Sequence, residues 1–247
     1  MISTTLEPMD SRTVAAFLSQ VELFKQLDSE SLATLSERVR QQTMKPGQAI
    51  FVQDEPGDRM FVLVNGTVKL FIRFQTGEII ELIRHTPPAA FGEVSLLDGG
   101  KRSATAEAVS SVRLLAIARN DLMEIIRVQP EVIDQLLHTL GAIIRRTTDQ
   151  VTELAFLGLQ GRVARRLLLL TEGFEDDEVQ GVSQAEFASM VGGSRQSVND
   201  VLKRLEQRGF IAMTRGRVTA IRDARKLREL AKGLARDTDP NTLNYEI

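Results

Sequence analysis

The hydrophobic pattern of the chain changes its period near Lys45, and this change restricts the folds that the chain can adopt. Over residues 11–43, apolar side chains recur at near-helical spacing, which predicts short amphipathic helices. Over residues 45–118, short alternating or β-branched runs are separated by glycines at positions 47, 57, 66, 77 and 92. Several short strands at this spacing are typical of a small antiparallel barrel or jelly roll. We therefore expect an all-β body that follows a few short helices.

One turn within this body has a specific signature. The dipeptide Asn65-Gly66 separates the runs FVLV and TVKLF. A two-residue type I′ turn needs positive φ at both central positions, and asparagine followed by glycine is the pair that adopts it most readily. The pattern therefore predicts a β-hairpin centred on this dipeptide.

A long helix is predicted after Pro130, because apolar residues continue at alternating steps of four and three. The positions on this seam are Ile133, Leu137, Leu140, Ile144, Thr147, Val151 and Leu154. A seam this narrow is more typical of a pairing surface than of a globular core, so we expect a two-stranded coiled coil and a homodimer. Thr147 interrupts the apolar seam and is followed by Thr148. A threonine hydroxyl on a helix can also bond its own backbone carbonyl, so the residue type alone does not identify a ligand contact.

Near the C-terminus, two short helices are predicted around a glycine turn. Ser183 and Glu186 form a capping box, and Gly192-Gly193 end the first helix. Ser194 can cap a second helix over Arg195–Arg208, which ends at Gly209. Such a pair is a helix-turn-helix, and the following run FIAMTRGRVTAI predicts a β-hairpin wing.

The second helix of this pair has an apolar face and a polar face. If Val198, Val201, Leu202 and Leu205 face a core, the side chains that face outward are of the types that read base edges in a major groove. Asp200 lies on or near that outward face and would repel a phosphate, unless it accepts a hydrogen bond from a cytosine amine. The candidate DNA-binding residues are Ser194, Arg195, Gln196, Ser197, Asn199, Lys203 and Arg215.

The distribution of charge supports DNA as a partner of this segment. The whole chain has a formal net charge of −2, but residues 181–232 hold eleven Lys and Arg against five Asp and Glu, a net charge of +6. A compact basic segment on an acidic body indicates a local contact with a polyanion. Because the chain has no cysteine, it has no disulfide and no iron–sulfur cluster. With no membrane span or signal peptide in the pattern, we expect a cytoplasmic location and no membrane partner.

The stretch FGEVSLLDGGKRSATA, residues 91–106, gathers polar residues of three kinds around a glycine turn. Glu93 follows Gly92 directly, and Arg102 is followed by Ser103. An arginine can make charge-assisted bonds to a phosphate, a carboxylate can accept from a sugar hydroxyl, and glycine allows close backbone approach. These residue types favour a site for a small anionic ligand, and a plain surface loop is the alternative.

The order of barrel, seam helix and helix-turn-helix resembles the Crp–Fnr family of bacterial transcription regulators, over residues 18–225. The most specific segments are FGEVSLLDGGKRSATA, RTTDQVTELAFLGLQGRVARRLL and SQAEFASMVGGSRQSVNDVLKRLEQRGFI. The resemblance implies an α+β chain with a cyclic-nucleotide-binding β-barrel (jelly roll), a long dimerisation helix and a winged helix-turn-helix. The expected parts are an N-terminal arm (1–17), the nucleotide-binding domain (18–129), the dimerisation helix (130–157), the DNA-binding domain (158–232) and a tail (233–247).

The resemblance also implies roles for the individual residues. Its cyclic-AMP-binding branch uses the glutamate that matches Glu93 for the ribose 2′-hydroxyl, and the pair that matches Arg102 and Ser103 for the cyclic phosphate. Backbone N–H groups near Gly92 and Val94 assist, and the matches of Thr147 and Thr148 meet the adenine, one of them from the partner subunit. Cyclic AMP is thus the expected effector, a palindromic DNA duplex the expected partner, and RNA polymerase a further partner.

Several positions depart from the family pattern. The spacing from Glu93 to Arg102 is one residue shorter than in the best-known member, and Thr148 stands where that protein has serine. Arg195 is retained on the recognition helix, but Gln196 replaces a glutamate and Asp200 an arginine. We therefore expect this chain to recognise a DNA sequence different from that of the best-known member.

Other functions remain open from the residues alone. The pocket could take cyclic GMP or a cyclic dinucleotide, or the chain could bind DNA without a nucleotide. A haem-based sensor would need His85 or His138 as an axial ligand, since the chain has no other histidine. A scaffolding subunit that never touches DNA is a further alternative. We expect no enzyme and no metal site, because the chain lacks GxSxG, Walker and HExxH motifs.

Overall fold

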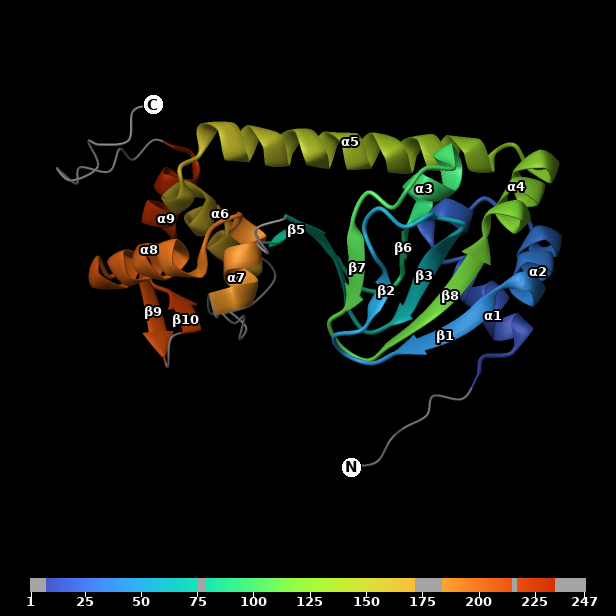
Figure 1. Cartoon of the computed structure of the whole chain (residues 1–247), viewed down its shortest axis with the longest axis horizontal. Helices are drawn as coiled ribbons and strands as arrows, with labels where there is room; N and C mark the ends of the chain where they lie inside the picture. The colour runs from blue at the N-terminus through green and yellow to red at the C-terminus, as the bar shows by residue number, and fades with distance from the viewer. Residues whose placement is uncertain (1–7, 75–78, 172–183, 215–216, 234–247) are drawn as a thin grey trace. The chain divides into compact units, whose positions relative to one another are not determined.

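The computed structural model describes residues 8–74, 79–171, 184–214 and 217–233, and the chain divides into two compact units. The first unit consists of residues 1–77 and 81–145, and the second of residues 78–80 and 146–247. The division falls within the long helix that the sequence predicts over residues 130–157. Figure 1 labels most of the helices and strands of both units.

The first unit opens with α1 (Ser11–Leu18), a 3₁₀ helix (Glu22–Phe24) and α2 (Ser29–Arg38). Asp10 and Asp28 cap the two α-helices, because each carboxylate accepts the backbone N–H of the residue three positions later. Val14 and Leu18 are fully buried in the core of this unit. Residues 11–18 therefore form a packed helix, as the near-helical spacing of apolar residues predicts.

Eight strands then form two four-stranded antiparallel sheets. One sheet has the order β1 (Arg40–Met44), β8 (Val112–Ala118), β3 (Arg59–Asn65) and β6 (Ala89–Phe91). The other has the order β2 (Ala49–Phe51), β7 (Thr105–Ala108), β4 (Val68–Arg73) and β5 (Ile79–His85). Two sheets of this order make a jelly-roll body, as the spacing of short strands predicts.

The predicted hairpin at Asn65-Gly66 is wrong. Strand β3 pairs with β8 and β6, whereas β4 pairs with β7, so the turn carries the chain from one sheet to the other. Gly66 has a φ of 89°, but among the described residues other than glycine only Asp54 has a positive φ, so Asn65 does not form a type I′ turn. The next residue, Thr67, is held instead from a distant loop, by the Ser110 hydroxyl and the Val109 N–H.

The helical pattern predicted through residue 43 is also wrong at its end. Helix α2 ends at Arg38, and residues 40–44 form β1, which pairs along its whole length with β8. Five polar or flexible residues, RQQTM, give little local preference for a strand. The neighbouring apolar strand β8 supplies the backbone partners that decide the conformation.

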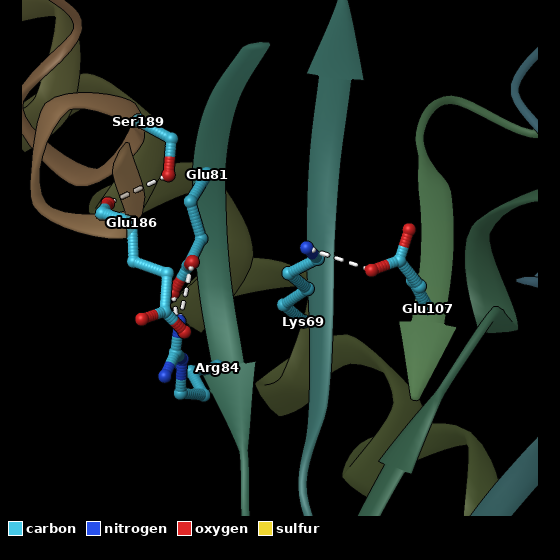
Figure 2. A network of polar contacts seen from close by, with 6 residues as sticks. All are labelled: Lys69, Glu81, Arg84, Glu107, Glu186 and Ser189. Carbon is cyan, nitrogen blue, oxygen red and sulfur yellow. Dashed lines mark hydrogen bonds and ion pairs between the residues drawn. The ribbon is translucent and has the colours of Figure 1, made fainter. Parts of the chain in front are cut away.

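A cross-strand ion pair marks the register of the second sheet. Lys69 on β4 stands opposite Glu107 on β7, and its Nζ lies 2.8 Å from the Glu107 carboxylate. Figure 2 shows this pair together with a second one that lies within a single strand, β5. There the buried carboxylate of Glu81 accepts two hydrogen bonds from the Arg84 guanidinium. Opposite charges placed directly across a pair of strands stabilise that register.

The core of the first unit has two parts. Between the sheets, the rings of Phe51, Phe61 and Phe91 lie with centroids 5.7–6.1 Å apart and are almost fully buried. On the outer side of the β1 sheet, α1, α2 and α4 (Arg119–Val128) enclose Met60, Ile117 and other apolar side chains. The short helix α3 (Glu93–Asp98) follows β6 and adds Leu96 to this second part.

Helix α5 (Val132–Phe156) continues without a break for 25 residues, as predicted. The second unit contains α6 (Leu159–Thr171), α7 (Gln184–Val191), α8 (Arg195–Gln207), β9 (Ile211–Thr214), β10 (Arg217–Ile221) and α9 (Ala224–Ala231). Its core lies between α6, α8 and α9, with Val163, Leu167, Leu202 and Leu227 fully or almost fully buried. Among the described helices, none has the length and hydropathy that a membrane span requires.

Candidate effector and DNA sites

A glycine turn begins the candidate effector site. Gly92 has a φ of 81° and forms the N-cap of α3, and Gly99 ends that helix at a φ of 72°. A Cβ on Gly92 would lie 2.9 Å from Nη1 of Arg102. Glycine is thus required here twice, for the left-handed backbone and for the close approach of the guanidinium.

Arg102 lies under this turn and is 4% exposed. Its Nη1 donates to the Gly92 carbonyl at 2.9 Å and to the Ser95 hydroxyl at 2.8 Å, and its Nη2 donates to the Arg59 carbonyl at 2.7 Å. Its backbone is fixed as well, because its N–H donates to the Glu55 carbonyl and its carbonyl accepts the Asp54 N–H. The side chain is therefore held by the start of α3 and by the first residue of β3, and its backbone is held by the loop before β3.

Among the described residues, no counter-ion contacts the guanidinium of Arg102. Within the described residues, no carboxylate lies within ion-pair distance of the guanidinium, and its buried Nε donates to no acceptor. Burial lowers the pKa of Arg102, and the nearby charges of Asp58, Glu55 and Glu93 oppose that effect from beyond contact distance. A buried cation with a spare donor is well suited to an anion, because an added negative charge would offset its desolvation.

The guanidinium of Arg102 packs over the aromatic ring of Phe51. Cζ of Arg102 lies 4.2 Å from the centroid of Phe51 and 5.9 Å from that of Phe61. Attraction between a cation and the face of an aromatic ring strengthens when both groups are desolvated, as they are here. The ring also leaves the edge of the guanidinium available for hydrogen bonds.

The other predicted residues of this segment lie around Arg102 at different depths. Glu93 begins α3 and is 8% exposed, close enough to Arg102 to act on its charge. Val94 is half-buried, and Ser103 is exposed. The structure thus brings Gly92, Glu93 and Arg102 together and leaves the Ser103 hydroxyl at the surface.

Sequence reasoning missed three residues that hold the arginine: Ser95, Gly57 and Phe51. Ser95 lies within the quoted segment, and its spacing of seven from Arg102 carries no recognisable signal. Gly57 and Phe51 come from loops and strands about fifty residues earlier, so only the tertiary fold brings them to this place.

The seam residues of α5 form an apolar stripe on the surface of the single chain. Leu137, Ile144 and Val151 are 60–65% exposed, Ile133 and Leu154 are also exposed, and Leu140 is half-buried. Val132 and Leu136, on another face of the same helix, are buried in the core of the first unit. Thr147 and Thr148 are both exposed on α5 in the second unit, and their part in a ligand site stays a prediction.

Helices α7 and α8 form the predicted helix-turn-helix. The Ser194 hydroxyl accepts the Ser197 N–H at 3.1 Å and caps α8, and Gly209 has a φ of 73° just beyond its end. A Cβ on Gly193 would meet Leu159 and Val198 at 3.0 Å or less, which explains the glycine in the turn. In α7, the Ser189 hydroxyl donates to the Glu186 carbonyl, as Figure 2 shows.

The two faces of α8 separate as predicted. Val198, Val201, Leu202 and Leu205 are almost fully buried. The exposed residues of α8 include Arg195, Gln196, Ser197, Asp200 and Lys203, and Asn199 is half-buried. Strands β9 and β10 pair as an antiparallel wing, and the predicted contacts at Ser183 and Arg215 lie outside the described residues.

Two family models match the chain, one for each site. The model described as a cyclic nucleotide-binding domain matches residues 41–129, and the model described as a Crp-like helix-turn-helix domain matches residues 161–230. The first match contains Arg102 and the glycine turn, and the second contains α7, α8 and the wing. The chain therefore combines an effector-binding module with a DNA-binding module.

Whole-chain comparisons agree with these matches. A CRP-like cAMP-activated global transcriptional regulator of Mycobacterium tuberculosis is 31% identical over 221 residues, which cover 87% of this chain and 98% of that protein. A cyclic AMP receptor protein of Thermus thermophilus is 36% identical over 190 residues, covering 76% of this chain and 87% of that one. The solved structure of CLP, a c-di-GMP responsive global regulator of Xanthomonas campestris, shares the fold with a TM-score of 0.70 at 20% identity, over 78% of this chain and 99% of that one. Because the two family models match residues 41–129 and 161–230, and the M. tuberculosis regulator matches over nearly its whole length, the chain belongs to the CRP/FNR family of transcription regulators.

Proposed function

We propose that the chain is a homodimeric transcription regulator that binds cyclic AMP at Arg102 and thereby increases its affinity for a palindromic DNA site. The observation that carries the proposal is the buried guanidinium of Arg102, which has uncharged acceptors and no carboxylate in ion-pair contact within the described residues. A cyclic phosphate would supply the missing negative charge through charge-assisted hydrogen bonds.

The choice of cyclic AMP follows the relatives of higher identity. The regulator of M. tuberculosis is named as cAMP-activated, and the protein of T. thermophilus as a cyclic AMP receptor. The X. campestris regulator responds to c-di-GMP on the same fold, so the fold alone does not select the nucleotide. In the proposed complex, Glu93 accepts from the ribose 2′-hydroxyl, Ser103 assists Arg102 at the phosphate, and Thr147 and Thr148 meet the base.

The dimer is supported by the exposed seam of α5. Large aliphatic side chains that are 60–65% exposed on one stripe of a helix are costly in water unless a partner covers them. A second copy of α5 presents the same stripe, and in a coiled coil the a/d seam of one helix packs against the a/d seam of the other. The dimer would then place two α8 helices in successive major grooves, roughly 34–36 Å apart.

Each α8 would read bases through its exposed polar side chains. Arg195 can bond guanine O6 and N7, while Gln196 and Asn199 can pair with adenine. Ser194 and the N-terminus of α8 would contact a backbone phosphate, and Lys203 with Arg215 would add positive charge. RNA polymerase is a further proposed partner of the DNA-bound dimer.

Calorimetric titration of the whole chain with cyclic AMP, cyclic GMP and cyclic di-GMP tests the effector. We expect saturable heat with cyclic AMP at one site per chain and a weaker response to cyclic GMP. Binding of cyclic di-GMP alone would reassign the effector, and the absence of heat with all three would overturn the proposed effector site.

Fluorescence anisotropy with a labelled duplex library tests the regulation. For a ligand to shift the DNA-competent state from 1:99 to 99:1, it must prefer that state by about 5.5 kcal/mol. We expect cyclic AMP to tighten DNA binding by at least tenfold. Equal DNA affinity with and without nucleotide would contradict the proposed regulation. The chain would then bind DNA independently of the Arg102 site.

A further inference from the structure

The hydrogen bonds of Arg102 leave a defined number of donors for a ligand. A guanidinium has five N–H donors. Three of them are taken, by the Gly92 carbonyl, the Ser95 hydroxyl and the Arg59 carbonyl. The Nε donor and one donor of Nη2 have no acceptor among the described residues, so at most two donors remain for a ligand.

All three acceptors of the guanidinium are uncharged. A carboxylate in any of these places would neutralise Arg102 and compete with an anionic ligand for it. A hydroxyl or a carbonyl fixes the orientation of the guanidinium and leaves its full charge to the ligand. Two of the acceptors are backbone groups, which any sequence supplies, and only the Ser95 hydroxyl depends on the identity of a side chain.

Ser95 is held firmly in this place. The residue is 2% exposed, on the first turn of α3. Gly57 packs against it so closely that a Cβ at position 57 would overlap the Ser95 side chain and lie 3.2 Å from Cζ of Arg102. Among the described residues, the Ser95 hydroxyl has one hydrogen-bond partner, the Nη1 of Arg102 at 2.8 Å.

We infer that Ser95 is a positioning residue for the phosphate-binding arginine, and that Gly57 reserves the space in which Ser95 and Arg102 meet. The inference rests on the proposed function, because it concerns how Arg102 grips a phosphate. Ser95 touches no ligand in this scheme and acts only by orienting Arg102. Without its hydroxyl, Nη1 keeps one acceptor in place of two, and the guanidinium can rotate over the face of Phe51.

The first test compares cyclic AMP affinity of the full chain with that of Ser95→Ala. We expect affinity to fall about tenfold, which corresponds to about 1.4 kcal/mol. Asp98→Ala is the matched control, because Asp98 lies on the same short helix, is exposed, and accepts the Gly100 N–H without touching Arg102. The control should keep wild-type affinity, and circular dichroism melting of each variant reports whether it folds.

The second test separates positioning from a general structural effect by a double-mutant cycle with Arg102→Lys. Lysine keeps the charge but has no planar fork, so Ser95 can no longer orient it. In that background Ser95→Ala should change affinity less than twofold, whereas a merely structural role would give the same tenfold decrease in both backgrounds. Gly57→Ala, which displaces the hydroxyl without removing it, should reproduce the weaker binding of Ser95→Ala.

The outcomes distinguish this inference from the proposed function. If Arg102→Lys weakens cyclic AMP binding and Ser95→Ala does not, Ser95 has no positioning role and the effector site stands. An equal effect of Ser95→Ala in both backgrounds also overturns the inference. If the wild-type chain binds none of the three nucleotides, the proposed effector site fails and the inference fails with it.

Discussion

Arg102 shows how a single residue can be both costly and useful. A buried guanidinium without a counter-ion in contact weakens the folded state, and the hydrogen bonds to Gly92, Ser95 and Arg59 offset only part of that cost. The same charge would favour an anion at the proposed effector site. In the proposed complex, a bound anion would offset that cost and so stabilise the folded state.

Removal of that side chain should abolish the effector response. Arg102→Ala is expected to weaken cyclic AMP binding by about 1.5–3 kcal/mol, the usual worth of hydrogen bonds to a charged group, as measured by calorimetry. Arg40→Ala, an exposed arginine on β1, is the control and should bind as the wild type. Unchanged affinity in Arg102→Ala would remove this residue from the site.

A second prediction concerns base reading by Arg195, which is exposed at the start of α8. Arg195→Ala should reduce discrimination between duplexes by about 1–3 kcal/mol in competition binding. Arg208 is exposed at the far end of α8, over the ring of Phe210, and serves as the control. Arg208→Ala should leave the sequence preference unaltered, so an equally weakened preference in both variants would argue against base reading by Arg195.

At the residue scale, sequence and structure contribute differently to the effector site. Glu93 and Arg102 could be chosen from sequence because their chemistry is unusual beside a glycine turn. Ser95, Gly57 and Phe51 could not, because a serine, a glycine and a phenylalanine have many ordinary roles. Only their distances to the guanidinium reveal what they do here.

At the scale of elements, the sequence predicts the long periodic segments well, and it fails at the turn Asn65-Gly66. The a/d spacing predicted α5 over nearly its observed length, and the apolar face of α8 was assigned correctly. The prediction of a hairpin at Asn65-Gly66 rests on a signal of only two residues. Pairing of β3 with β8 and of β4 with β7 outweighs that local preference, because each of those pairings adds several backbone hydrogen bonds.

The seam of α5 gives a direct test of self-association. Ile144→Glu should dissociate the proposed dimer, because a charge would enter the middle of the apolar stripe. Ala142→Glu adds the same charge to an exposed position off the seam, and the molecular mass of the assembly should remain that of the dimer. Sedimentation equilibrium measures both variants, and a wild-type chain that is monomeric at micromolar concentration would contradict the seam hypothesis.

At the scale of the whole molecule, charge is unevenly divided. The net charge of +6 over residues 181–232 coincides with the helix-turn-helix, the wing and α9, while the remainder of the chain is acidic. An acidic body beside a basic module disfavours DNA contacts anywhere else on the chain. The overall charge of −2 would by itself have given no indication of a nucleic-acid partner.

Salt dependence should therefore report on the basic module alone. For a dimer that neutralises six to ten phosphates, DNA affinity should fall about 10³–10⁵-fold between 50 and 200 mM salt. Anisotropy titrations at several salt concentrations give this slope. Lys203→Ala should make the slope shallower by about one for each phosphate that the variant no longer neutralises, and an unaltered slope would place Lys203 away from the DNA backbone.

The uncompensated cation under the glycine turn has a consequence for how such proteins change over time. Replacement of a buried charge by a hydrophobic side chain of similar volume is often neutral or stabilising. A descendant that no longer needed its effector could accept leucine or methionine at position 102 and unfold at a higher temperature. If Arg102 binds the effector as proposed, an apolar residue at position 102 in a related regulator would indicate that this site is no longer used.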